Sequence, residues 1–223
     1  MKSPVATADA SHAETRRLLL EAAGEVFAEF GFRDATVREI CRRAGANIAA
    51  VNYHFGDKET LYAEVLRYAH TRALAKYPPL LDLPAAAPPE AKLRAFVKSF
   101  LLRIFDKGPN SWHGKLMSRE MIEPTAALDA LVEERMRPMA GLIWQIVAGI
   151  LDCPLNDERV RLYALSVVSQ CVFYHHCGPV VSRLFPKHLP LDRAGIERLA
   201  DHITRFSLTA MKHLPKPPPK KKP

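Results

Sequence analysis

Residues 36–61 contain several helix-start signals and two turn glycines in close succession. Small polar residues, which accept hydrogen bonds from the free amides of a helix start, precede each predicted helix, and a glycine follows each of the two short ones. The spacing predicts two short helices joined by a tight turn, followed by the capped start of a third helix. The predicted caps and turn residues are Thr36, Gly45, Asn47, Gly56 and Asp57.

The rest of the chain also favours helices. A capping box at Ser11 to Glu14 opens a helix that Gly31 ends, and residues 1–10 are expected to be disordered. The prolines within residues 78–90 exclude a continuous helix there and mark the expected domain boundary. Pro138 is expected to kink its helix or to mark a change of register. The later helices are expected at residues 90–106, 112–121, 125–151, 157–177 and 192–213.

Composition excludes several classes of protein. No apolar run approaches the roughly 18 residues that span a bilayer, and the N-terminus lacks the apolar core of a signal peptide. The cysteines form no Cys-x-x-Cys pair, which favours a reducing compartment, so we expect a soluble cytoplasmic protein without a membrane partner. The net charge is +8, but residues 212–223 contribute five lysines and no acid. Charge by itself therefore does not indicate a nucleic-acid partner.

The second short helix has the composition of a helix that enters a DNA groove. At about nine residues it is not stable alone in water and must be braced by its neighbours. Small side chains allow the backbone to approach the groove closely, Asn52 can pair with adenine, and Tyr53 and His54 can donate to phosphates. The residues expected to face inward are Ile40, Ala44, Val51 and Phe55. The residues expected to face outward are Ala46, Asn47, Ala49, Ala50, Asn52, Tyr53 and His54.

Two further positions are candidate phosphate contacts. Lys58 lies in the first turn of a helix, where the helix dipole disfavours a cation, and a phosphate there would bind both Lys58 and the free amides. Thr36 offers a similar hydroxyl and amide site at the start of its helix. The alternative interpretation is a solvated lysine and two ordinary helix caps.

Residues 11–66 resemble the N-terminal domain of the TetR family of bacterial transcriptional regulators. The matching segments are residues 29–32, 36–37, 40, 44–45 and 51–58. The resemblance implies phosphate contacts for Tyr53, His54 and Lys58, and a base contact for Arg38. The family commonly has Tyr where this chain has Asn52.

The C-terminal half is similar to the CecR subgroup of that family. The matching segments are residues 119–132, 137–138, 157–161 and 169–174. Together the two resemblances imply an all-α dimeric repressor with a ligand pocket in its larger domain. The expected division is a three-helix helix-turn-helix DNA-binding domain at 11–56, a connecting helix at 57–78, a ligand-binding and dimerisation domain at 79–213, and disordered tails at 1–10 and 214–223.

Two C-terminal segments are the expected dimer interface. The helix at 157–177 is apolar on nearly every side and must be covered on both faces, and apolar residues between 196 and 210 repeat at the spacing of a helix-pairing seam. We interpret them as a four-helix bundle across a two-fold axis, and the alternative is that both are plain core. The expected interface residues are Leu165, Val168, Val172, Ile196, Leu199, Ile203 and Phe206.

Aromatic and sulfur side chains near the middle of the chain are candidates for lining a pocket. Such a pocket would favour a hydrophobic or aromatic effector, although the same residues at helical spacing also fit a core. They are Phe100, Phe105, Trp112, His113, Met117, Met121, Trp144 and Tyr174.

No cofactor and no metal site are expected. Cys171 and His175 share a helical face, but no carboxylate follows at a recognisable ligand spacing. The sequence therefore predicts a ligand-responsive regulator on the bacterial nucleoid that binds a near-palindromic DNA operator as a homodimer and is released by a small-molecule effector. The alternatives are a helical adaptor that binds a small molecule without an operator, and an enzyme, for which no nucleophile with a paired base is present. The lysine-rich tail fits a solvated segment or non-specific DNA contact.

Overall fold

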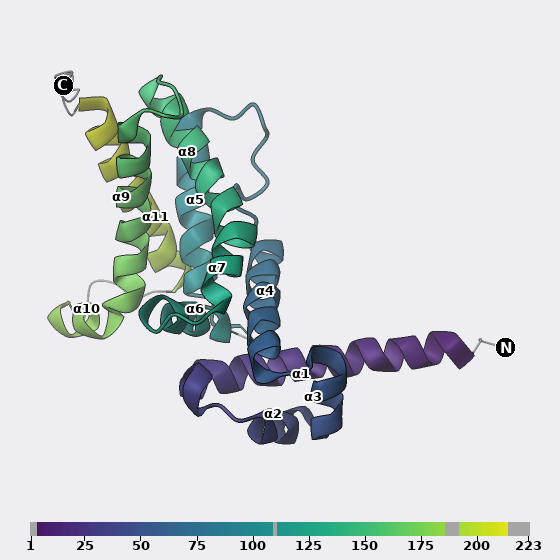
Figure 1. The fold of residues 1–223 in the computed structure, drawn as a ribbon. Coiled ribbons are helices and arrows are strands. Elements are labelled where there is room, and N and C mark those ends of the chain that lie inside the picture. The colour runs from purple at the N-terminus through teal and green to yellow at the C-terminus, as the bar shows by residue number, and fades with distance from the viewer. Residues whose placement is uncertain (1–3, 109–110, 186–191, 214–223) are drawn as a thin grey trace, which may run out of the picture. The chain divides into compact units, whose positions relative to one another are not determined.

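The structure is a computed structural model that describes residues 4–108, 111–185 and 192–213 (Figure 1). Within these ranges the regular elements are helices and no strand is present, so the prediction of an all-α fold is confirmed. The chain divides into two compact units. The first contains Met1–Tyr77 and Arg103–Pro138, and the second contains Pro78–Leu102 and Met139–Pro223.

The first unit is built on its four N-terminal helices. They are α1 (Pro4–Asp34), α2 (Val37–Ala44), α3 (Ile48–Phe55) and α4 (Lys58–Lys76). Three later elements pack with them, namely α6 (Trp112–Ile122), α7 (Ala127–Leu131) and the π-helix η1 (Val132–Met136). Their shared core holds side chains from nearly every one of these helices, including Leu19, Phe27, Ile40, Val51, Leu61, Leu116 and Leu131.

The second unit contains most of the remaining helices. They are α5 (Pro89–Ile104), whose last residues belong to the first unit, α8 (Arg137–Leu151), α9 (Glu158–His176), α10 (Gly178–Leu184) and α11 (Arg193–His213). Its buried side chains include Leu93, Phe96, Val97, Leu101, Val147, Val160, Val167, Leu199 and Ile203. Ion pairs of Arg94 with Glu197 and Asp201 join α5 to α11.

Residues 103–138, which lie within the domain expected at 79–213, group with the N-terminal helices in the first unit. The reason lies on α6, where the buried Trp112 reaches α1 at Gly24 and Leu116 is fully buried in the core of the first unit. The Tyr62 hydroxyl on α4 also donates to the buried Glu120 on α6, at 2.7 Å. The chain passes between the two units at residues 77–78, 102–103 and 138–139, and only the first of these points lies at the Pro-rich boundary predicted for residues 78–90.

The start of α1 and the presence of α10 differ from the sequence prediction. α1 begins at Pro4, although the sequence predicts disorder up to residue 10 and a start at Ser11. Proline suits the first turn of a helix and the alanines that follow are strong helix formers, so this segment continues the helix N-terminally. α10 is not predicted by the sequence, and it begins where Pro179 can occupy an early helical position. The C-terminal tail at 214–223 lies outside the described residues.

The long helix expected at 125–151 is interrupted before Pro138. Five residues, Val132–Met136, form the π-helix η1, and α8 begins at Arg137. Pro138 has no N–H to donate to the carbonyl of residue 134, so the regular ladder cannot pass through this point. The predicted change of register at Pro138 is confirmed.

Candidate nucleic-acid interface

Local hydrogen bonds define the α2–turn–α3 segment in the way that the sequence predicts. The amide of Glu39 donates to Thr36 Oγ1 at 3.2 Å, and the amide of Ala50 donates to Asn47 Oδ1 at 2.8 Å. Gly45, at φ 64°, ends α2 in the left-handed conformation that favours glycine. Asp57 caps α4 by accepting from the amide of Thr60 at 2.7 Å. The predicted caps are confirmed at all three helix starts.

α3 is held by apolar contacts on one side only. Val51 and Phe55 are 1% and 6% exposed, and Ile40 of α2 is fully buried beside them in the same core. The guanidinium of Arg16 on α1 lies 5.3 Å from the centre of the Phe55 ring. The short helix is therefore braced by α1 and α2, and its other side faces solvent.

The outward side of α3, here called the reading surface, carries four of the predicted DNA-binding residues. Tyr53 is 71% exposed, and Asn47, Ala49 and Asn52 are also exposed. Ala50 is half-buried and packs against the core, so it limits how closely α3 lies to α2 rather than facing outward. Arg38 on α2 is exposed as well.

Two residues at this surface are missed by sequence reasoning. Ile48 is 53% exposed at the start of α3, although its spacing from Val51 suggests an inward position. His12, on the N-terminal half of α1, lies with its ring 5.6 Å from that of Tyr53. No signal in the 36–61 segment identifies His12, because tertiary packing alone brings α1 beside α3.

His54 and Lys58 make intramolecular contacts. His54 is half-buried, and burial, followed by the charges of His12 and Arg16, lowers its pKa, so it is neutral at pH 7. The Nζ atom of Lys58 donates to the carbonyl of Arg33 at 3.2 Å and lies 4.8 Å from the centre of the Phe32 ring. Lys58 thus connects the start of α4 to the end of α1. If Lys58 also contacts a phosphate, as predicted, the phosphate must either displace these contacts or bind in addition to them.

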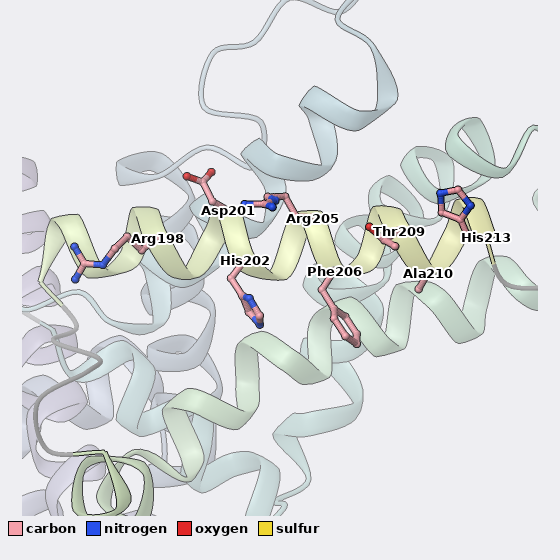
Figure 2. A pocket seen from close by; sticks show the side chains of 8 residues that line it. All are labelled: Arg198, Asp201, His202, Arg205, Phe206, Thr209, Ala210 and His213. Carbon is pink, nitrogen blue, oxygen red and sulfur yellow. The ribbon is translucent and has the colours of Figure 1, made fainter.

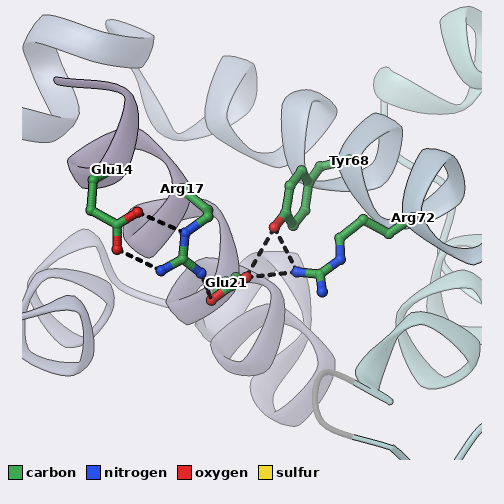
Figure 3. Close-up of polar contacts among 5 residues, drawn as sticks. All are labelled: Glu14, Arg17, Glu21, Tyr68 and Arg72. Atoms are coloured by element: carbon green, nitrogen blue, oxygen red, sulfur yellow. Dashed lines mark hydrogen bonds and ion pairs between the residues drawn. The ribbon is translucent and has the colours of Figure 1, made fainter. Parts of the chain in front are cut away.

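A polar network joins α1 to α4 (Figure 3). Glu21 accepts from Arg17 at 2.7 Å, from the Tyr68 hydroxyl at 3.0 Å and from Arg72 at 2.6 Å. Burial by itself raises the pKa of Glu21, but the hydrogen bonds from Tyr68, Arg17 and Arg72 outweigh it and leave the pKa below its ordinary value. The network therefore requires an ionised Glu21.

α6 is attached to the same helices at its C-terminal end. Arg119 donates to the backbone carbonyls of Ala28 and Glu29 on α1 at 3.0 and 2.8 Å. The buried Glu120 accepts from the Tyr62 hydroxyl and from the amide and hydroxyl of Thr125. A displacement of α6 would therefore be transmitted to both α1 and α4.

The predicted pocket residues are divided between the two units. Phe105, Trp112, His113, Met117 and Met121 belong to the first, and Phe100, Trp144 and Tyr174 belong to the second. Trp112 is part of the core, Met117 packs against that core, and Met121 is 44% exposed. A pocket lined by these residues stays a prediction.

A hollow of about 850 Å³ lies along the exposed side of α11. Figure 2 shows the side chains that line it. It is lined by Arg198, Asp201, His202, Arg205, Phe206, Thr209, Ala210 and His213. Phe206 is 61% exposed there, and Leu165 on α9 is 63% exposed, while Val168 and Val172 are half-buried.

Three of the predicted interface residues are buried in the core of the second unit. Ile196, Leu199 and Ile203 are 5%, 2% and 0% exposed within the single chain, because the apolar seam of α11 packs into its own unit. The seam spacing indicates that α11 pairs with a helix, but it does not distinguish a helix of the same chain from one of a partner.

The described residues contain no group of three or more His, Cys, Asp or Glu that could hold a metal ion. Cys171 is buried, and burial raises the pKa of the Cys41 and Cys153 thiols, which disfavours the reactive thiolate. No helix among the described residues is long and apolar enough to cross a membrane.

Comparison with known proteins agrees with this geometry. Residues 19–65 match the bacterial regulatory proteins of the tetR family, and residues 89–211 match the C-terminal domain of the HTH-type transcriptional dual regulator CecR. The chain belongs to the TetR family of transcriptional regulators, with a C-terminal domain of the CecR type. It is a DNA-binding regulator and not an enzyme.

Individual relatives cover most of the chain. The dual regulator CecR of Shigella flexneri is 28% identical over 78% of this chain and 80% of its own length. The repressor NicS of Pseudomonas putida is 27% identical over 90% of this chain and 92% of its own length. A structure of AibR with isovaleryl coenzyme A and operator DNA has the same fold, with a TM-score of 0.65 at 16% identity, covering 86% of this chain and 97% of that one.

Proposed function

We propose that this TetR-family protein is a ligand-responsive repressor that binds a near-palindromic operator as a homodimer. The observation that carries the proposal is α3, which is braced on one side and presents Asn47, Ala49, Asn52 and Tyr53 on the other. Two copies of such a helix, spaced about one DNA turn apart, would enter successive major grooves. A relative that is named a repressor, NicS, supports repression over activation. Operator binding would place the protein on the nucleoid in the bacterial cytoplasm.

Within the reading surface, the roles follow from chemistry and exposure. Asn52 is the candidate for a bidentate pair with adenine, and Ile48 can contact a thymine methyl group. Tyr53 and Thr36 can bind phosphates and fix the position of the helix without reading sequence. His54 is neutral at pH 7 and partly covered, so it would act as a hydrogen-bond donor rather than as a cation.

The dimer is proposed to form through α9 and α11. Leu165 and Phe206, with the half-buried Val168 and Val172, offer apolar surface that the single chain leaves uncovered. Exposed apolar surface of this kind marks an interaction site in a soluble protein. A two-fold pairing of α9 and α11 would give the four-helix arrangement that the sequence suggests.

A small hydrophobic or aromatic effector is proposed to release the operator. The effector would act through α6, whose Arg119 and Glu120 hold α1 and α4. A ligand shifts such an equilibrium only through its difference in affinity between the two states, and a change from 1:99 to 99:1 requires about 5.5 kcal/mol. AibR, crystallised with both operator DNA and isovaleryl coenzyme A, provides a precedent for the fold.

Selection of bound duplexes from a random pool tests the proposal, followed by affinity measurements for the Tyr53→Phe variant on the selected site. We expect an inverted repeat, and an affinity roughly 10-fold lower for Y53F because the phosphate hydrogen bond is lost in both subunits. Tyr163→Phe on α9 is the matched control and should bind like the wild type. If no repeat is enriched and binding depends steeply on salt alone, the protein is an adaptor whose lysine-rich tail contacts DNA.

A further inference from the structure

Buried polar atoms without a hydrogen-bond partner gather in the first unit, on α4, α6 and η1. They are Nδ1 of His70, Nε of Arg135, both ring nitrogens of His113 and Nε1 of Trp112. Buried polar groups in folded proteins nearly always have a partner, and each group left without one costs about 1–3 kcal/mol. These donors and acceptors give the first unit hydrogen-bonding capacity that a bound molecule could use.

His70 connects the members of this cluster. Its ring centre lies 6.5 Å from that of His113, which brings α4 and α6 together at this point. The positive charge of Arg135 on η1 acts on His70, and so does that of Arg103 at the end of α5. All four residues belong to the same compact unit.

Arg135 has no carboxylate partner among the described residues. The acidic residues next to it in the chain are engaged elsewhere, since Glu134 accepts from Arg67 at 2.8 and 3.2 Å and Glu133 binds Arg137. The charge of Glu134 acts on the half-buried Arg135, but the Glu134 carboxylate is hydrogen-bonded to Arg67 and forms no ion pair with Arg135. An anion bound beside Arg135 would supply such an ion pair.

The two histidines are neutral at pH 7 and so do not add charge. Burial lowers the pKa of His70 to about 4, with further lowering by Arg103 and Arg135. Burial also lowers the pKa of His113 to about 4. Electrostatic effects of His70 and Arg103 lower this pKa further, whereas the Arg103 backbone and Asp106 raise it by smaller amounts. Each neutral ring can donate one N–H, so the cluster combines two neutral donors with the nearby charges of Arg135 and Arg103.

The backbone that carries Arg135 is itself irregular. Arg135 lies on η1, and π-helical turns are rare and occur mostly at functional sites. The wider turn changes the direction in which residues 132–136 project, compared with a regular helix. Arg135 on this turn carries a planar guanidinium, a group that can donate two parallel hydrogen bonds to a carboxylate.

We propose that His70, His113 and Arg135 bind the carboxylate of the effector, which would make the effector a small organic acid with a hydrophobic or aromatic body. The assignment of this acid as the effector rests on the proposed function, whereas its binding to the cluster does not require DNA. His113 is a predicted pocket residue, and its role becomes that of a hydrogen-bond donor. Arg135 and His70 are not predicted by the sequence, because only the tertiary structure brings them together.

The test measures binding without DNA, by NMR of the histidine rings and by tryptophan fluorescence. The probes are benzoate and octanoate, their neutral amides benzamide and octanamide, and inorganic phosphate. We expect at least one acid to shift the His70 and His113 ring signals saturably and its amide to bind at least about 10-fold more weakly. Arg135→Gln should weaken acid binding by roughly 10–100-fold. Arg137→Gln, an exposed arginine near Arg135 in the chain with its own partner Glu133, is the control and should bind like the wild type.

Several results would overturn the proposal. They are equal binding of acid and amide, unchanged binding in R135Q, no ring shift with either acid up to its solubility limit, and binding of phosphate alone. If R135Q does not fold, His70→Gln replaces it with the same expected loss. Acid binding without any effect on the selected operator would leave the carboxylate site in place and reject its role as effector site. Failure of operator selection with acid binding intact would reject the proposed function alone.

Discussion

Gly24 on α1 lies so close to Trp112 of α6 that an added methyl group would not fit between the two helices. A Cβ atom there would lie 2.3 Å from the ring of Trp112, which is too close for any side chain. Trp112 is 9% exposed and cannot move away without opening the core. We expect Gly24→Ala to lower the free energy of unfolding by about 1–3 kcal/mol, as measured by urea denaturation.

Gly141→Ala is the matched control for this prediction. Gly141 lies within α8, and nothing within 4 Å would meet its added Cβ atom. Alanine favours a helix interior over glycine, so G141A should raise the free energy of unfolding by about 0.5–1 kcal/mol. If both variants were stabilised, the contact between Gly24 and Trp112 would not be as tight as described.

Asn47 caps α3 and also lies on the reading surface that is proposed to contact DNA, and two substitutions separate these roles. Asn47→Ala removes the acceptor for the Ala50 amide and should lower the free energy of unfolding by about 1 kcal/mol. Asn47→Asp keeps an acceptor and should unfold like the wild type, but its negative charge should weaken operator binding. Chemical denaturation and binding to the selected operator give the two readouts. Equal operator affinity of N47D and wild type would place α3 away from DNA.

At the scale of helices, the Glu21 network makes the joint between α1 and α4 sensitive to pH. The pKa of Glu21 is lowered in the folded protein, so the ionised network stabilises the fold above the ordinary pKa near 4.5 and this contribution is lost as the pH falls through the lowered value. Glu21→Gln should cost about 1–2 kcal/mol at pH 7, with a difference from wild type that shrinks in acid.

Thermal unfolding of E21Q and wild type across this pH range measures the effect. Glu14→Gln is the control, because Glu14 binds the same Arg17 from an exposed position and should change stability little. A pH-independent difference between E21Q and wild type would mean that packing, and not the charge of Glu21, joins the helices.

At the scale of the whole molecule, dimer formation is expected to depend on the exposed side chains of α9 and α11. Phe206→Arg places a charge in the proposed interface and should convert the protein to a monomer in sedimentation velocity experiments. Operator affinity should then fall by at least about 100-fold, because the two half-sites no longer bind as one unit. Ile122→Arg, on an exposed isoleucine of the first unit, should remain dimeric. A dimeric F206R would locate the interface elsewhere.

The local structure of the α2–turn–α3 segment follows from the amino-acid sequence alone. Helix caps and turn glycines act over three or four residues, so the order of residues is enough to assign the roles of Thr36, Gly45, Asn47 and Asp57. The register change before Pro138 is predictable for the same reason, since a missing N–H is a local property. The all-α fold likewise follows from helical spacing and the lack of strand patterns in the sequence.

Tertiary packing, in contrast, sets what each apolar or polar face contacts. Periodicity shows that Leu199 and Ile203 face a helix, but only the packed unit reveals that this helix belongs to the same chain. The same holds for the attachment of α6 to the N-terminal helices through Trp112, and for the approach of His70 on α4 to His113 on α6. Spacing along a helix defines which residues share a face, whereas the partner of that face depends on contacts between segments far apart in the sequence.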